Sequence, residues 1–136
     1  MNPLIVRIIG VVSGVIAIAL GENVASRFYK LPSSIDPKDT VALTNYINGQ
    51  MPMEAFWSII ASYAFGSFVA GSVVTFVDDK SSFGNAIFVG AILAGFGIIN
   101  YVMIPHPIWF SITSTLIYIP FSLLGHYVSK LFVKAS

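Results

Sequence analysis

Long runs of apolar residues dominate the chain and are separated by short polar segments. A helix needs about 20 apolar residues to cross a hydrocarbon core about 30 Å thick, and four runs reach that length. Only helices and closed barrels satisfy every backbone hydrogen bond in lipid, and barrel strands are much shorter and alternate in polarity. The pattern therefore predicts membrane-spanning helices over residues 3–29, 53–77, 83–104 and 107–132.

Polar and proline-containing breaks separate these runs. The charged segment 78–82 predicts a tight turn between the second and third helices. Pro105, His106 and Pro107 predict another turn, because the residue before a proline avoids the helical region, and Pro107 suits the first turn of the fourth helix. With four crossings, both termini lie on one side. We therefore expect an all-α, up-down-up-down membrane bundle that forms a single domain over residues 1–136.

The connection between the first two spans is the longest and carries the signals of a helix of its own. Asp36 is a suitable N-cap, Pro37 a suitable first helical residue and Gly49 a suitable terminator. Apolar residues recur between them. We expect a short amphipathic helix over residues 37–48 that lies over the end of the bundle or in the headgroup region.

Small residues recur at helical intervals in every span. Lipid tails are as apolar as leucine, so membrane helices gain stability from close backbone approach and hydrogen bonds. Hydroxyl-bearing residues form a seam along one face of the fourth helix, which we interpret as a packing surface. The alternative is a water-filled pathway lined by these hydroxyls, next to a kink at Pro120. The residues expected at helix contacts are Gly10, Gly14, Gly66, Ser111, Thr115 and Ser122. Small residues at these intervals also favour self-association, so we expect a homo-oligomer or assembly with other membrane proteins.

The stretch IALGENVASRFYK, residues 18–30, carries polar side chains where the first span reaches its far boundary. Glu22 follows about eighteen apolar residues, which cover roughly 27 Å of the hydrocarbon core. The third span runs in the same direction and ends in polar residues at the same depth. The residues expected to converge on one polar pocket beneath the surface helix are Glu22, Asn23, Arg27, Asn100, Tyr101 and His106.

Three interpretations of this pocket are open at the level of sequence. The polar residues fix helix packing and anchor the bundle. Alternatively, they bind a ligand, an ion or a proton, since acidic groups near a membrane interior are costly and tend to be functional. In the third interpretation, Glu22 and His106 form an acid–base pair, but no nucleophile with a positioned base is visible. His126 lies toward the opposite end, where we expect a packing role.

Composition narrows the classes of function. The 136 residues are 56% hydrophobic and 10% charged, more apolar than a soluble domain of this size could bury, so the lipid bilayer is the first expected partner. A net charge of +1 gives no electrostatic footprint for nucleic acid. The absence of cysteine excludes thiolate metal sites, and the two histidines lack metal-ligand spacing. No nucleotide, haem or selectivity-filter motif is found, so no cofactor or metal is expected.

These observations favour a non-enzymatic membrane protein that acts by assembly or by ligand binding. The alternative is a small transporter or channel that uses Glu22 for a proton or a cation, and a membrane-embedded enzyme comes third. Basic residues are slightly more numerous on the side of the termini, which favours both termini in the cytoplasm of a multi-pass protein. That side collects Arg7, Lys80, Lys130 and Lys134, and the other collects Arg27, Lys30 and Lys38.

The segment PHPIWF, residues 105–110, together with Glu22 and the loop IDPKD, residues 35–39, resembles small four-span membrane proteins of bacteria. The resemblance covers most of the chain. Its matching points are Glu22, Asp36, Pro37, Asn100, Pro105, His106, Pro107 and Trp109. It implies a bacterial cytoplasmic membrane and favours a shared pocket over incidental polarity, and it carries no catalytic or transport role.

Overall fold

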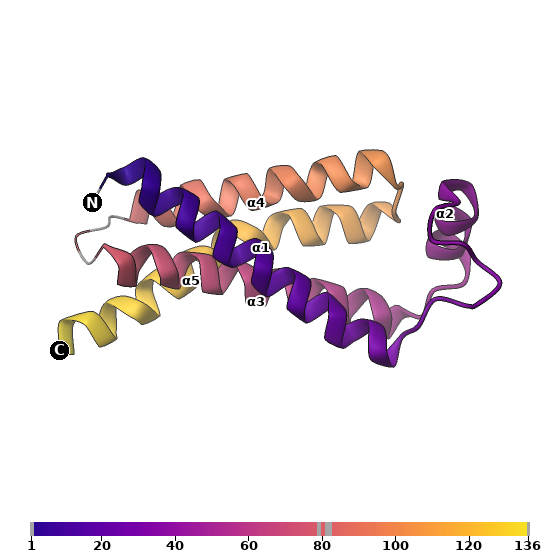
Figure 1. Cartoon of the computed structure of the whole chain (residues 1–136), viewed down its shortest axis with the longest axis horizontal. Coiled ribbons are helices and arrows are strands. Elements are labelled where there is room, and N and C mark those ends of the chain that lie inside the picture. Colours follow the sequence, from indigo (N-terminus) through magenta and orange to yellow (C-terminus); the bar gives the residue numbers. More distant parts are fainter. Residues whose placement is uncertain (1, 79, 81–82, 136) are drawn as a thin grey trace.

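The computed structural model describes residues 2–78, 80 and 83–135, and this part of the chain is built from helices and the segments that join them (Figure 1). The helices are α1 (Pro3–Phe28), α2 (Thr40–Gly49), α3 (Met53–Val77), α4 (Phe83–Met103) and α5 (Ile108–Ala135). All except α2 are long and apolar enough to cross a membrane. The predicted fold class, an all-α membrane bundle with a short helix in the first loop, is confirmed.

The long helices alternate in direction along the chain, so both ends of the chain lie at one end of the bundle and α2 lies beyond the other (Figure 1). α1 packs chiefly against α3, α3 against α5, and α5 against α4. α3 is therefore the central helix and the most buried of the long helices that the structure describes. A side chain on α3 can consequently contact residues from every other span.

Glycines let α1 and α3 approach closely. A Cβ atom at Gly14 would stand 3.0 Å from the Cβ atom of Ala70 and 3.2 Å from the carbonyl oxygen of Gly66. One at Gly66 would stand 2.8 Å from the carbonyl oxygen of Gly14. Gly10 faces Val74 in the same interface. These glycines pack within one chain, so substituting them tests the fold rather than self-association.

The contact between α3 and α5 is also close. Gly71 lies against the backbone of Ser122, and Gly125 lies against the carbonyl oxygen of Phe68. Ser122 is fully buried, and its hydroxyl donates to the carbonyl oxygen of Ala86 on α4 at 2.7 Å. This part of the hydroxyl seam therefore lies in a packed interface where α3, α4 and α5 meet.

Ser111 and Thr115, the other residues of α5 expected at helix contacts, lie nearer the start of the helix. The Thr115 hydroxyl donates to the carbonyl oxygen of Ser111 within the helix at 2.6 Å, and both residues are half-buried. Pro120 lies inside the helix and has no N–H to donate to the carbonyl of Leu116. α5 bends along its length (Figure 1), which is the expected response to a proline in a helix interior.

α2 begins later than the sequence predicts. The expected N-cap at Asp36 is wrong, because the helix starts at Thr40 and the Asp39 side chain accepts the capping bond from the backbone N–H of Ala42 at 3.1 Å. Asp36 instead closes the preceding turn by accepting from the backbone N–H of Lys38 at 2.9 Å. The segment IDPKD thus holds two aspartates that can cap, and the earlier one stabilises a turn.

Side chains of α2 and of the segment after it tie this helix to the end of the bundle. Ile47 and Met51 pack against the hydrophobic core. The side-chain amide of Asn48 donates to the carbonyl oxygen of Pro105 at 2.9 Å. α5 begins at Ile108, one residue later than expected, and Pro107 precedes it. α2 is therefore linked directly to the turn that joins α4 and α5.

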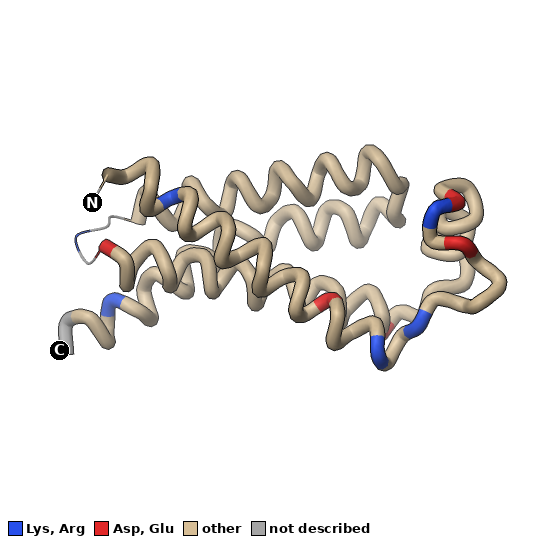
Figure 2. Tube along the Cα trace, viewed as in Figure 1, with Lys and Arg blue, Asp and Glu red and all other residues tan. Residues whose placement is uncertain are grey.

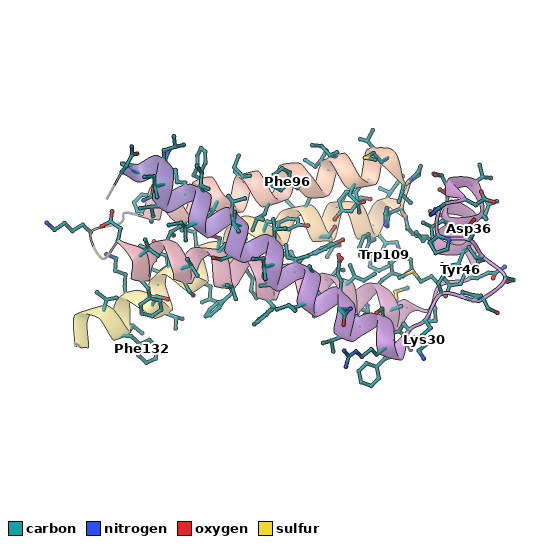
Figure 3. The ribbon with its side chains drawn as sticks, viewed as in Figure 1. Lys30, Asp36, Tyr46, Phe96, Trp109 and Phe132 are labelled. Atoms are coloured by element: carbon teal, nitrogen blue, oxygen red, sulfur yellow. The ribbon has the colours of Figure 1, made fainter. Side chains whose placement is uncertain are left out.

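The outer surface suits a lipid environment. Large apolar side chains such as Leu20, Phe96 and Leu116 are exposed along the long helices. Figure 3 shows Phe132 projecting away from the bundle near the C-terminal end. Charged residues gather toward the two ends of the molecule (Figure 2), whereas Glu22 lies within the α1 span. The chain is therefore a small polytopic membrane protein.

Candidate ligand-binding cavity

A cavity of about 260 Å³ lies at the α2 end of the bundle. Residues of α1, of α3 and of the end of α4 surround it, together with the turns that follow α2 and α4. Its polar lining residues are Glu22, Ser26, Tyr29, Ser58, Tyr63, Asn100 and His106. We call it the Glu22 cavity.

Part of the predicted pocket forms around this cavity. Glu22, Asn100 and His106 line it, although they belong to three different segments of the chain. Tyr101 is not a lining residue, but its ring packs edge-on against the His106 ring, with centroids 5.2 Å apart. Tyr101 therefore supports the wall of the cavity from behind.

Asn23 and Arg27 do not join the cavity. Neither is a lining residue, and Arg27 donates to the Asn23 side chain at 3.4 Å along the surface of α1. Each residue of a helix is rotated by about 100° from the one before, so Asn23 and Arg27 point about 100° and 140° away from Glu22. Proximity in sequence to Glu22 was therefore a poor guide to which side chains share its cavity.

Tyr63 of α3 lines the cavity together with Glu22. Its side chain is 6% exposed, and its hydroxyl interacts with the Glu22 carboxyl group. On its other side, the Tyr63 hydroxyl interacts with that of Tyr101. Tyr101 in turn contacts the hydroxyls of Ser114 and Tyr118. Glu22 therefore stands at one end of a chain of hydroxyl groups that runs into the bundle.

The direction of one bond in this chain follows from counting protons. Ser114 is fully buried, and its hydroxyl donates to the carbonyl oxygen of Phe110 at 2.7 Å. A serine hydroxyl has one proton to donate. The Tyr101 hydroxyl must therefore be the donor in its contact with Ser114. The chain of hydroxyls is thus anchored to backbone at its inner end.

The charge of the Glu22 cavity is set by its carboxyl group. Among the described residues that line it, none is lysine or arginine. Arg27, the nearest basic residue along α1, is bound to Asn23 on the helix surface. Glu22 lies six residues before the end of α1 at Phe28, about 9 Å along the axis, where water competes less than it does at the surface. Such a site favours a positively charged occupant.

His106 closes the cavity from the turn between α4 and α5. Its Nδ1 atom contacts the carbonyl oxygen of Ile104, which can only accept, so Nδ1 carries the proton and Nε2 of the neutral ring is an acceptor. Burial lowers the pKa of His106 below its ordinary value, and the bond to Ile104 opposes this only in part. At neutral pH the ring is therefore uncharged and offers a lone pair rather than a competing positive charge.

An aromatic cluster holds this end of the bundle in place. The Phe110 ring stacks on His106 with centroids 5.3 Å apart and lies 5.2 Å from the ring of Phe56. Phe56 in turn meets Trp109 edge-on at 5.3 Å, and Trp109 lies at the α2 end of the bundle (Figure 3). Packed rings of this kind have well-defined positions. This cluster therefore fixes the position of His106 in the wall of the Glu22 cavity.

A second cavity of about 350 Å³ borders the first. Glu22, Tyr63 and Asn100 line both, so the carboxyl group lies between them. The second cavity extends along α1 and α4 to Val15 and Leu93, further toward the middle of the spans. Its additional lining is mostly apolar.

Tyr63, Ser114 and Tyr118 were not among the residues predicted for the site. All three are buried within spans, Tyr63 in α3 and the other two in α5. A tyrosine hydroxyl inside a membrane helix requires a hydrogen-bonding partner, which was a usable signal. Tyr63 in particular lies on the α3 face that carries Ser62 and Gly66, and this face packs against α1.

The serines of the cavity lining use their hydroxyl protons within their own helices. In the described part of the chain, no group of three metal-ligating side chains is found. The hydroxyls of Ser26 and Ser58 donate to carbonyl oxygens of their own helices, to Asn23 and Ala55, each at 2.7 Å. A serine used in this way is not held toward a base, as nucleophilic catalysis requires.

Comparison of the chain with protein-family models, with curated proteins and with solved structures finds no match. The fold and the cavity define the class: a small polytopic membrane protein with a polar cavity at one end of its bundle.

Proposed function

We propose that the protein is non-enzymatic and binds a small organic cation in the Glu22 cavity. The observation that carries this proposal is a carboxyl group that faces a cavity of about 260 Å³ with no lysine or arginine among the described lining residues. A carboxylate at this depth is costly unless a positive charge or a proton compensates it. A bound ammonium group would supply that charge.

The lining restricts the size and shape of the ligand. Sites for drug-sized molecules measure about 300–1,000 Å³, so a cavity of about 260 Å³ suits a smaller molecule. Tyr29, Tyr63 and His106 provide aromatic surface, and Met51 closes the side next to α2. Aromatic rings attract cations and also pack against apolar groups. A small organic cation with an ammonium group on a compact apolar group matches these features.

Binding is tested with the purified protein in lipid nanodiscs by calorimetry. The probes are benzylamine, tetramethylammonium and the neutral analogue benzyl alcohol. We expect benzylamine, which is protonated at neutral pH, to bind, and Glu22→Gln to weaken its binding at least about tenfold, since a hydrogen bond to a charged group contributes about 1.5–3 kcal/mol. Tetramethylammonium has no N–H to donate and should bind more weakly than benzylamine. Glu54→Gln is the matched control, because Glu54 lies at the same end, is exposed and is not a lining residue. Equal affinities in both variants, or equal binding of benzyl alcohol, would contradict the proposal.

A second candidate function is transport of a proton or a cation. It is supported by the position of Glu22 between two cavities and by the hydroxyl chain that begins at Tyr63. Flux into proteoliposomes that carry the protein, lost in Glu22→Gln and retained in Glu54→Gln, would favour transport. Ligand binding without flux in the wild-type protein would favour a binding role alone.

Three further proposals concern the membrane that holds the protein, its orientation and its assembly. We infer a bacterial cytoplasmic membrane from the resemblance of PHPIWF and IDPKD, and cytoplasmic termini from the distribution of lysine and arginine. Assembly with a second copy or another membrane protein remains a prediction. It requires the outward faces of the helices, because Gly14 and Gly66 pack within the chain.

A further inference from the structure

Arg7 lies in the first turns of α1, at the end of the bundle opposite the Glu22 cavity. Its Nε atom donates to the side-chain oxygen of Asn85 on α4 at 2.9 Å. Its guanidinium carbon lies 4.4 Å from the centroid of the Phe88 ring, also on α4. The guanidinium group is therefore oriented by two contacts across the α1–α4 interface rather than left to move freely in the headgroup region.

A groove of about 220 Å³ adjoins this guanidinium group. Apart from Arg7, its lining is apolar and comes from Leu4, Ile8, Val11 and Val12 of α1 and Phe88 and Ile92 of α4. Leu4, Ile8 and Val12 are each about half exposed, so the groove opens to the lipid. From Leu4 to Val12 it follows the helix for about 12 Å, the length of several methylene groups.

We propose that Arg7 binds the phosphate of an anionic phospholipid whose acyl chain occupies the groove. A guanidinium group carries five N–H donors, and the contacts described for Arg7 use one of them. Arginine matches phosphate geometry with paired hydrogen bonds, and basic pockets between membrane helices bind such headgroups. The apolar lining indicates a lipid rather than free phosphate, because free phosphate would gain nothing from it.

The proposal is independent of the Glu22 cavity and bears on orientation. An anionic lipid held at Arg7 would attach the end of the bundle that carries the termini to the leaflet richer in anionic lipid. In cell membranes that is the cytoplasmic leaflet. This orientation of the termini agrees with the one inferred from the distribution of basic residues.

Lipid retention measured by native mass spectrometry tests the proposal. The protein is titrated in detergent with phosphatidylglycerol and, separately, with phosphatidylcholine of the same chain length. We expect a preference for phosphatidylglycerol of about fivefold, the effect of one basic residue near the membrane surface. Arg7→Gln should abolish the preference. Arg27→Gln should retain it, because Arg27 is the matched arginine of α1 at the other end and is bound to Asn23.

A second variant tests the groove separately from Arg7, and a competing anion distinguishes a bound lipid from free phosphate. Ile8→Trp fills the mouth of the groove at an exposed position, leaves Arg7 in place, and should reduce retention of both lipids even if Arg7→Gln fails to fold. Inorganic phosphate should not displace bound phosphatidylglycerol. Equal retention of the two lipids by the wild-type protein, a preference that survives Arg7→Gln, or complete displacement by inorganic phosphate would each overturn the assignment.

Discussion

Gly66→Ala adds one methyl group at the point where α1 and α3 cross. The new Cβ atom would stand 2.8 Å from the carbonyl oxygen of Gly14, a backbone atom that cannot rotate away. To reach an ordinary van der Waals separation, α1 must move outward by roughly half an ångström against a closely packed interior. Overpacking of this kind costs about 1–3 kcal/mol, so we expect the free energy of unfolding to fall by that amount.

The same displacement should reach the Glu22 cavity, because α1 carries Glu22 and α3 carries Tyr63. Reversible unfolding in mixed micelles, followed by circular dichroism, gives the free energy of unfolding, and calorimetry gives the affinity for benzylamine. Gly95→Ala on α4 is the control, since a Cβ atom there meets nothing within 4 Å. If Gly66→Ala is as stable as Gly95→Ala and binds equally well, the close α1–α3 crossing does not hold the cavity together.

Two further predictions concern the cavity walls. Tyr63→Phe should weaken binding of the cationic probe by about threefold to tenfold while unfolding stays cooperative, because the Glu22 carboxyl group loses the interaction with the Tyr63 hydroxyl, and a hydrogen bond contributes about 0.5–1.5 kcal/mol; unchanged affinity would remove Tyr63 from the site. Burial lowers the pKa of His106, so the unfolded chain binds more protons and the free energy of unfolding should decrease as pH falls below about 6.5. In His106→Gln that decrease between pH 7 and pH 5 should be smaller, and equal slopes in chemical unfolding would contradict this.

Local features of the sequence were sufficient for the architecture. The spans follow from apolar length, and the turns follow from Pro105, Pro107 and the charged segment 78–82. The onset of α2 was misplaced because Asp36 and Asp39 are equally good caps by residue type. Which of them caps the helix depends on the turn that Pro37 and Lys38 adopt before it. Capping preferences rank residue types, and they do not choose between two neighbours of the same type.

The sequence predicted only part of the cavity lining. Depth in the membrane brought Glu22, Asn100 and His106 into one prediction, since each lies near the same end of its segment. Depth could not separate them from Asn23 and Arg27, which share that level and face outward. Nor could it reveal Tyr63, which lies in the middle portion of its span and reaches Glu22 across the α1–α3 contact.

Sequence alone thus determined that lipid surrounds this chain, how many times the chain crosses it, and which polar groups lie at each level, because hydropathy and helix rise are properties of single segments. Only the tertiary structure decided which side of each helix faces inward. That rotation depends on where Gly14, Gly66, Gly71 and Gly125 allow backbones to meet, and on which hydroxyls find partners across those contacts. In a bilayer these contacts carry the packing energy, since lipid and leucine are equally apolar.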